Sequence, residues 1–272
     1  MQSYRTFLCE NGIEFFSPLP ISECKLTRPY LLDKISDFIP QSVLVILLPY
    51  YAGETENISV YASARDYHLY TRRLLSELSA VLQREYEGYR FYGFSDHSPI
   101  DERDAAVKAG LGVFGDNGLL INDRYSSFVF LCEIISDLPP DAFGENKIEP
   151  SRKCEGCGAC KKACPTGILL GKSELCLSAV TQKKGELTEE ERELILRTGS
   201  VWGCDLCQDA CPYTKKAKEN GTIMTPIPFF REKRITALSE EILSEMSEEE
   251  FKERAFSWRG REPLLRNLKI LE

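Results

Sequence analysis

Apolar residues recur along the first half of the chain with two different periods. Residues 43–48 form an unbroken aliphatic run that ends at Pro49, which predicts a buried strand. Between residues 62 and 87 apolar side chains return at helical spacing, while arginines occupy the other side, and Gly88 follows as a natural stop. This second pattern predicts a long amphipathic helix that packs on a sheet.

Shorter patterned segments complete the predicted first domain. We expect strands at 90–95, 119–122 and 127–135, and a short helix at 101–109 that ends at Gly110. Residues 1–140 are therefore predicted to form a compact α/β (α+β) domain, and the proline-containing segment 138–144 is predicted to be a linker.

The remaining residues, 145–272, are predicted to form a ferredoxin-like domain with a helical tail. Two capping boxes mark helix starts in it, Thr188-x-x-Glu191 and Ser247-x-x-Glu250. The first of these helices is predicted to end at Gly199.

Composition and charge exclude some classes of protein. With 43% apolar and 28% charged residues the chain resembles an ordinary globular protein with a core. The longest apolar stretch, 43–51, is far shorter than the roughly 18 residues that a membrane span needs, and residues 1–12 lack the apolar centre of a secretory leader. We therefore expect a cytoplasmic protein without a membrane partner. A net charge of −8 and a pI of 5.1 argue against a general nucleic-acid electrostatic footprint.

Eight of the eleven cysteines follow one pattern. The first run is C-x2-C-x2-C-x3-C-P, the spacing of bacterial ferredoxins, in which the fourth thiolate ligates the other cluster. The pattern predicts two [4Fe–4S] clusters. We assign one cluster to Cys154, Cys157, Cys160 and Cys211, and the other to Cys164, Cys176, Cys204 and Cys207.

Zinc is the alternative metal, because paired C-x2-C units also form four-thiolate sites. Zinc requires neither the third cysteine of the first run nor the prolines after Cys164 and Cys211, so the pattern favours iron–sulfur. Disulfides are disfavoured because nothing indicates an oxidising compartment. The other cysteines, Cys9, Cys24 and Cys132, lack ligand spacing and are predicted to be buried thiols.

The glycine-rich stretch 110–118 lacks the G-x-x-x-x-G-K-[ST] pattern of a phosphate loop, and it precedes a predicted strand instead of opening a helix. Its glycines indicate close backbone approach or positive φ. A tight turn and a ligand-contacting loop both remain open on this pattern.

Four blocks give the chain a specific resemblance. They are Tyr61-Ala-x-x-x-Asp66-Tyr67-His68, the Asp96-x-x-Pro99 turn, Ala109-Gly-Leu-Gly-x-x-Gly115-x-Asn117, and the cysteine array with Gly203-Cys-Asp-x-Cys-Gln208. With these blocks the chain resembles the epoxyqueuosine reductases, cobalamin-dependent iron–sulfur enzymes that complete queuosine synthesis in tRNA. The resemblance begins at about residue 40 and extends to Pro263-Leu-Leu-Arg-Asn267.

The resemblance implies that the first domain binds cobalamin and that a low-potential donor of the ferredoxin or flavodoxin type reduces it through both clusters. It also implies that Asp96 donates a proton to the substrate, although an aspartate before x-x-Pro is also a common turn residue. His68 is expected to position the cofactor or the wall of the site. The other expected cofactor contacts are Gly110, Gly112, Gly115, Asn117 and Leu120.

Longer members of the family continue into a helical-repeat domain that helps to grip tRNA, so the resemblance implies a short form that lacks this domain. Three functions therefore remain open. The leading hypothesis is reduction of epoxyqueuosine in tRNA. The alternatives are a corrinoid-dependent reductase of a small molecule and a ferredoxin-type electron carrier without a corrinoid.

Overall fold

The computed structural model describes residues 3–144, 148–150 and 152–272. By spatial proximity the chain forms two compact units, and neither is continuous in sequence. Unit 1 comprises Met1–Pro49, His68–Glu155 and Thr225–Ile227, and unit 2 comprises Tyr50–Tyr67, Gly156–Met224 and Pro228–Glu272. These units are defined by spatial proximity and do not test whether the chain divides into two independently folding domains at residues 140–145, which stays a prediction.

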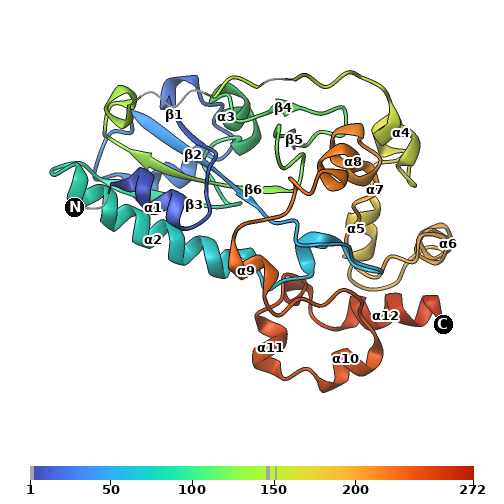
Figure 1. The fold of residues 1–272 in the computed structure, drawn as a ribbon. Helices are drawn as coiled ribbons and strands as arrows, with labels where there is room; N and C mark the ends of the chain where they lie inside the picture. The colour runs from blue at the N-terminus through green and yellow to red at the C-terminus, as the bar shows by residue number, and fades with distance from the viewer. Residues whose placement is uncertain (1–2, 145–147, 151) are drawn as a thin grey trace. The chain divides into compact units, whose positions relative to one another are not determined.

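Unit 1 is built on a four-stranded sheet in the order β1-β2-β6-β3, in which every neighbouring pair is antiparallel (Figure 1). The strands are β1 (Phe16–Pro20), β2 (Ser42–Pro49), β3 (Phe91–Phe94) and β6 (Val129–Ser136), with a separate pair of β4 (Val113–Phe114) and β5 (Leu120–Ile121). The helices of this unit are α1 (Tyr4–Glu10), α2 (Tyr67–Glu85) and α3 (Glu102–Lys108). The predicted α/β (α+β) class is confirmed, and the antiparallel sheet makes it α+β.

Helix α2 lies along one face of this sheet (Figure 1). Its buried side chains recur at helical spacing, from Tyr70 through Leu78 to Leu82. The closest approach is at Gly93 of β3, where an added Cβ would lie 2.7 Å from the Cβ of Leu75. Glycine at this position therefore allows the helix to sit directly against the strand.

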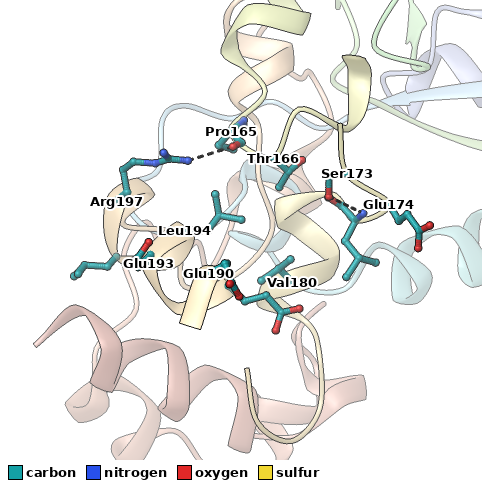
Figure 2. A pocket seen from close by; sticks show the side chains of 12 residues that line it. Pro165, Thr166, Ser173, Glu174, Val180, Glu190, Glu193, Leu194 and Arg197 are labelled. Carbon is teal, nitrogen blue, oxygen red and sulfur yellow. Dashed lines mark hydrogen bonds between the residues drawn. The ribbon is translucent and has the colours of Figure 1, made fainter. Parts of the chain in front are cut away.

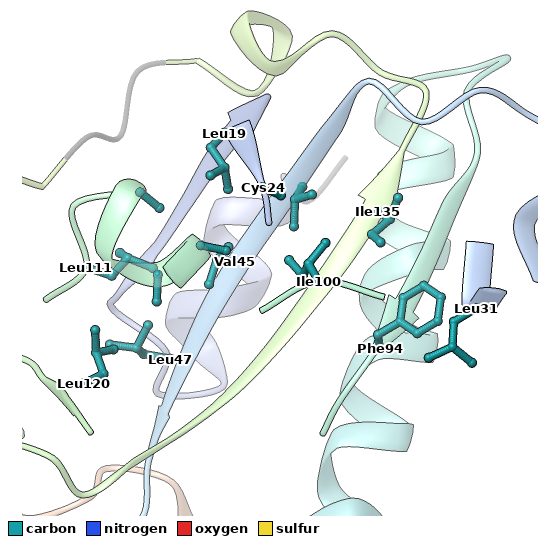
Figure 3. Packing of buried hydrophobic residues seen from close by; sticks show 14 of the residues in the cluster. Leu19, Cys24, Leu31, Val45, Leu47, Phe94, Ile100, Leu111, Leu120 and Ile135 are labelled. Atoms are coloured by element: carbon teal, nitrogen blue, oxygen red, sulfur yellow. The ribbon is translucent and has the colours of Figure 1, made fainter. Parts of the chain in front are cut away.

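The opposite face of the sheet carries a core of aliphatic side chains (Figure 3). Val43, Val45 and Leu47 alternate along β2 toward this face, as the period of a strand requires. They pack with Ala105 and Ala106 of α3, whose small side chains bring that short helix close to the sheet. The predicted strand at 43–48 is thus confirmed, and it is buried on both faces.

Unit 2 consists of short helices joined by turns. Its helices are α4 (Ala159–Ala163), α5 (Leu177–Thr181), α6 (Glu189–Thr198), α7 (Leu206–Asp209), α8 (Pro212–Glu219), α9 (Pro228–Arg231), α10 (Glu240–Glu245), α11 (Glu248–Lys252) and α12 (Glu262–Leu271). Both predicted capping boxes are formed, and α6 ends at Gly199 as expected. In the part of the chain that the structure describes, no helix combines the length and apolar character that a bilayer crossing requires.

Three expectations from the sequence were wrong in detail. The long helix begins at Tyr67 and not near residue 62, because Val60–Ala62 form a 3₁₀ turn and Asp66 is a residue type favoured just before a helix. Strand β1 was missed because Pro18 and Pro20 disfavour a strand, although an edge strand tolerates proline. Cys9 is exposed, since α1 buries Tyr4, Phe7 and Leu8, whereas Cys24 and Cys132 are buried as expected.

We predict that Gly93→Ala destabilises unit 1 by about 1–3 kcal/mol, because the new methyl group would overlap Leu75 and force α2 away from the sheet. Urea unfolding monitored by circular dichroism measures the change. The control is Tyr92→Phe, at a neighbouring side chain that is 41% exposed, which we expect to change the free energy of unfolding by less than about 0.5 kcal/mol. Equal stability of Gly93→Ala and the wild type would contradict this account of the packing.

Candidate functional site

Asp96 lies in a tight turn that follows β3. Its φ angle is +62°, in the left-handed region that non-glycine residues seldom adopt and that aspartate tolerates better than most. The backbone N–H of Asp96 donates to Oε1 of Glu102 at 3.1 Å, and the N–H of His97 donates to the carbonyl of Ser95 at 2.7 Å. These two bonds hold the turn in its strained shape.

The Asp96 carboxylate extends into solvent, with 69% of its side chain exposed. Its Oδ2 lies 3.8 Å from Nε2 of His68, the second residue of α2, a separation that fits an ion pair better than a short hydrogen bond. The His68 imidazole is the main cause that lowers the pKa of Asp96, and Arg28 and His97 add to the effect. The structure thus brings together two residues that the sequence analysis had assigned separate roles.

The lowered pKa determines how this pair can hold a proton. A carboxylate with a depressed pKa is ionised near neutral pH and acts only as an acceptor. A proton that Asp96 delivers must therefore come from a neighbouring group, and the His68 imidazole, 3.8 Å away, is placed to supply it. The arrangement of Asp96 with His68 suits general acid chemistry better than either residue alone.

A buried and a partly buried carboxyl group, Glu133 and Glu102, lie behind this turn, and the sequence analysis did not identify them. Glu133 of β6 is 0% exposed and accepts a hydrogen bond from the hydroxyl of Ser98, which is also fully buried. Glu102 begins α3 and approaches the Glu133 carboxyl within hydrogen-bonding reach. A signal for this pair was present in the sequence, since Glu133 is the one charged residue in the apolar run 128–135.

Packing within the protein accounts for three of the glycines in the block 110–118. A Cβ at Gly110 would lie 2.2 Å from the carbonyl oxygen of Ile148, and one at Gly112 would lie 2.6 Å from that of Ile121. At Gly115 the nearest atom would be Oδ1 of Asn117, at 2.5 Å. These glycines are thus required by close approach of the chain to itself.

The other residues expected to contact the corrinoid also have local roles. Oδ1 of Asn117 accepts the N–H of Leu119 at 3.2 Å, and Leu120 is buried in the core of unit 1. Within the same loop Gly118 has no atom within 4 Å of an added Cβ, and Phe114 is 45% exposed. Contact of this loop with a corrinoid stays a prediction, and the exposed positions of the loop are Phe114, Asp116 and Gly118.

Seven of the eight array cysteines belong to unit 2, and Cys154 lies at the end of unit 1. Burial raises the pKa of Cys204 to about 12, and it does the same for Cys207. Cys176 adds to both shifts, and Cys164 and Cys160 also lie close enough to raise the pKa of Cys207. The thiols of Cys164, Cys176, Cys204 and Cys207 therefore lie near one another, and they are the four that we assigned to one cluster.

The surroundings of Cys164 favour its thiolate form. Burial raises its pKa, but hydrogen bonds from the Thr166 side chain and from the backbone N–H groups of Leu169, Thr166 and Gly167 outweigh this effect and lower it. N–H groups directed at a sulfur are a means of tuning iron–sulfur clusters. Among the described residues, no three His, Cys, Asp or Glu side chains converge on a single-ion site. A cubane does not need such convergence, because each thiolate binds a different iron.

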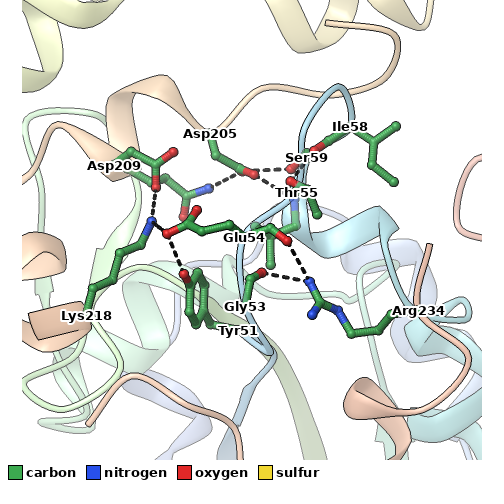
Figure 4. Close-up of polar contacts among 12 residues, drawn as sticks. Tyr51, Gly53, Glu54, Thr55, Ile58, Ser59, Asp205, Asp209, Lys218 and Arg234 are labelled. Carbon is green, nitrogen blue, oxygen red and sulfur yellow. Dashed lines mark hydrogen bonds and ion pairs between the residues drawn. The ribbon is translucent and has the colours of Figure 1, made fainter. Parts of the chain in front are cut away.

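A buried aspartate fixes the loop that carries Cys204 and Cys207 (Figure 4). Oδ1 of Asp205 accepts the Ser59 hydroxyl at 2.7 Å, and Oδ2 accepts the N–H of Val60 at 2.6 Å. Burial raises the pKa of Asp205 to about 6. At Gly203 an added Cβ would lie 2.5 Å from the Cβ of Ser59, so only glycine fits there.

A second network in unit 2 holds the start of the segment 50–67 (Figure 4). Nζ of Lys218 contacts Oε1 of Glu54 at 2.9 Å and Oδ1 of Asp209 at 2.7 Å. The guanidinium of Arg234 donates to the carbonyls of Ala52 and Gly53 at 2.6 and 2.7 Å. This segment is therefore tied to the cysteine-bearing helices by charged hydrogen bonds.

A cavity of 680 Å³ opens beside Pro165, directly after Cys164 (Figure 2). Apolar side chains such as Leu194 line it together with four glutamates, at 174, 190, 191 and 193, and with Arg197. The carboxylates outnumber the single arginine, so the cavity is unsuited to a phosphate group. We assign it no part in the proposed chemistry.

Two family models match separate parts of the chain. Residues 39–97 match the family described as "Epoxyqueuosine reductase QueG, DUF1730", and residues 153–214 match a 4Fe-4S double cluster binding domain. The first range includes both His68 and Asp96. The prediction of two [4Fe–4S] clusters is confirmed, whereas the assignment of individual cysteines to each cluster stays a prediction.

Known proteins are similar to this chain over most of its length. An epoxyqueuosine reductase of Listeria monocytogenes is 34% identical over 250 residues, covering 85% of this chain and 64% of the relative. The chain thus spans less than two thirds of that relative's length. The solved structure of epoxyqueuosine reductase from Streptococcus thermophilus matches 98% of this chain and 79% of its own, with a TM-score of 0.76 and 25% identity. A crystal structure of an epoxyqueuosine reductase with an epoxyqueuosine-modified tRNA-Tyr stem loop has the same TM-score and coverage, at 22% identity.

We predict that Cys176→Ala lowers iron and sulfide content to about half, because one of the two clusters loses a ligand and the other keeps all four. Iron analysis and electron paramagnetic resonance of the anaerobically reconstituted protein measure the loss. Cys9→Ala is the matched control, since this exposed cysteine lies outside the array. If Cys176→Ala retained the wild-type iron content, the proposed ligand set would be wrong.

Proposed function

Because the chain belongs to the epoxyqueuosine reductase-like family, we propose that it reduces epoxyqueuosine to queuosine in tRNA. The main support for the proposal is the contact between Asp96 and His68. Both residues lie in the range 39–97 that matches the epoxyqueuosine reductase family model. A separate double-cluster domain in the same chain supplies a route for electrons. An acid and an electron supply are the two things that the reaction requires.

The chemistry balances with these components. Removing the epoxide oxygen breaks two C–O bonds, forms a C=C bond and releases water, which consumes two electrons and two protons. Each [4Fe–4S] cluster carries one electron at a time. Asp96, supplied through His68, would give one proton to the departing oxygen, and a positioned acid of this kind accelerates such a step.

The electrons need a source and a final carrier. We propose a low-potential donor protein of the ferredoxin or flavodoxin type, because the clusters must be reduced from outside the chain. A bound corrinoid would supply a cobalt centre that accepts electrons from the clusters and passes them to the substrate. Contacts to it from the loop that contains Phe114 and Gly118 are part of this proposal, and the space beside Gly118 is consistent with them.

The substrate has one alternative. The epoxyqueuosine reductase solved with a modified tRNA stem loop supports tRNA as the substrate of this chain. The net charge of −8 instead favours a small molecule, because the charges of the phosphate backbone would be repelled. A corrinoid-dependent reductase of a small molecule is therefore the second candidate.

Asp96→Asn should retain both clusters but lose turnover by about 10²–10⁴-fold, because the amide fills the same space without a transferable proton. Anaerobic assays with epoxyqueuosine-containing tRNA and a chemical reductant measure the rate. Asp33→Asn, at an exposed aspartate of the same unit, should leave the rate unchanged. Full activity of Asp96→Asn would exclude Asp96 as the acid.

The choice of substrate is tested in cells that lack epoxyqueuosine reductase. Expression of this chain should restore queuosine in digested tRNA, measured by mass spectrometry, whereas Asp96→Asn should leave epoxyqueuosine. If the wild-type protein carries both clusters and a corrinoid, as spectroscopy of the purified protein would establish, and still leaves only epoxyqueuosine, the small-molecule alternative replaces the tRNA assignment.

A further inference from the structure

The carboxyl groups of Glu102 and Glu133 present an electrostatic problem inside unit 1. Oε1 of Glu133 accepts the Ser98 hydroxyl, and that hydroxyl accepts the N–H of Ile100 at 3.2 Å. Oε2 of Glu133 is buried and meets no N–H or O–H donor among the described residues. The carboxyl group of Glu133 also interacts with another carboxyl, that of Glu102.

One proton between the two groups resolves this problem. Two adjacent carboxylates cannot both be ionised in a buried site, because desolvation and mutual repulsion each oppose the second charge. Burial is the main cause that raises the pKa of Glu102 to about 7, and it raises that of Glu133 well above the usual range. Above about pH 7 the pair therefore holds one proton, which leaves Glu102 as the charged acceptor.

The charged carboxylate of Glu102 accepts a hydrogen bond from the backbone of the Asp96 turn. Oε1 of Glu102 receives the backbone N–H of Asp96 at the residue where φ is +62°. A hydrogen bond to a charged oxygen is about twice as strong as one to a neutral oxygen, and a left-handed aspartate needs such compensation. The pair thus stabilises the strained turn from the interior of the unit.

We propose that Glu102 and Glu133, which share one proton, form a positioning pair that holds the Asp96 turn in its left-handed conformation. This inference rests on the proposed function only in that Asp96 is the acid. Neither glutamate contacts the substrate in this account. Glu133 holds Glu102, and Glu102 holds the backbone of Asp96.

The other titratable and charged groups around the pair come from each neighbouring segment. Cys24 and Arg28 come from the segment after β1, Asp96 from the turn, and Cys132 from β6. His68 of α2 and His97 of the turn act on Asp96, which lies next to Glu102. Arg28 is a permanent cation near Glu102, and it also donates to the carbonyl of Ser98 at 3.4 Å. It opposes the rise in the pKa of Glu102 without neutralising the pair.

The raised pKa values have a consequence for stability. Since the folded protein binds these protons more tightly than the unfolded chain, their contribution to stability is fully present below the unfolded pKa, near 4.5 for Glu102. This contribution to stability is lost as the pH rises through about 7, the pKa of Glu102 in the folded protein. Glu133→Gln, whose amide can donate permanently to Glu102, should therefore reduce this loss of stability with pH.

The shared proton can be observed without an activity assay. Infrared spectroscopy at about pH 8, where free glutamate is ionised, should detect a protonated carboxyl band in the wild type that is absent from Glu133→Gln. Glu87→Gln, at an exposed glutamate, is the control and should keep the band. Absence of the band from the wild type would overturn the shared proton.

The positioning role is tested by hydrogen exchange at the Asp96 amide. Its exchange should be slow in the wild type and in Glu133→Gln, and about 10- to 100-fold faster in Glu102→Ala, which removes the acceptor. Glu102→Gln keeps an acceptor oxygen, so its Asp96 amide should exchange at an intermediate rate. This variant therefore distinguishes the loss of the Asp96–Glu102 hydrogen bond from a general loss of folding. Unchanged exchange in Glu102→Ala would overturn the inference.

Turnover then distinguishes this inference from the proposed function. If Asp96 is the acid, Glu102→Ala should lower kcat more than it changes KM, and Glu133→Gln should retain turnover and flatten its dependence on pH near 7. Faster exchange in Glu102→Ala with unchanged turnover would support the positioning pair and exclude Asp96 as the acid.

Discussion

The central antiparallel pair of β2 and β6 determines where the chemistry of unit 1 lies. Both strands occupy the middle of the sheet, and their register places Glu133 opposite Val45 on one side and Phe94 on the other. Because Phe94 is the last residue of β3, the turn that follows begins beside Glu133. A slip of one residue would turn Glu133 to the other face of the sheet and remove it from Glu102.

The same register explains why a buried carboxyl is tolerated here. Glu133 lies among apolar residues of β6, and an ionised, unpaired carboxylate there would be costly. Ser98, Glu102 and a shared proton satisfy its two oxygens. Unit 1 is therefore less stable at neutral and alkaline pH than it would be with an apolar residue at position 133. In return, the pair holds a turn in which Asp96 is exposed to solvent beside His68. Strain and burial of this kind are typical of functional positions.

Unit 2 reaches its arrangement by other means. Its helices are short, and several array cysteines stand at or next to a helix start, such as Cys176 before α5 and Cys211 before α8. Backbone N–H groups at such positions are free to bond a sulfur or to interact with a negatively charged cluster. Gly203 and Asp205 fix the loop between them with contacts that side chains of other sizes would not allow. Unit 2 is thus held by tight turns and capped helix ends together with two apolar clusters, one around Trp202 and Phe256 and one around Ile195.

Sequence patterns alone determined the features of this protein that depend on local spacing. The cysteine intervals predicted the two clusters, the aliphatic run predicted β2, and the capping boxes predicted α6 and α11, because each signal lies within a few residues of the structure it specifies. The motif blocks predicted the family, and they singled out Asp96 and His68 without relating them to each other.

Only the tertiary structure joined groups that are distant along the chain. It placed His68 beside Asp96, and it set Glu102 and Glu133 behind the turn, although helix, turn and strand are separated by up to 65 residues between His68 and Glu133. It also showed that Gly110, Gly112 and Gly115 pack against the protein itself. These relations depend on strand register and on the desolvation of buried charges, which no local pattern of residues encodes.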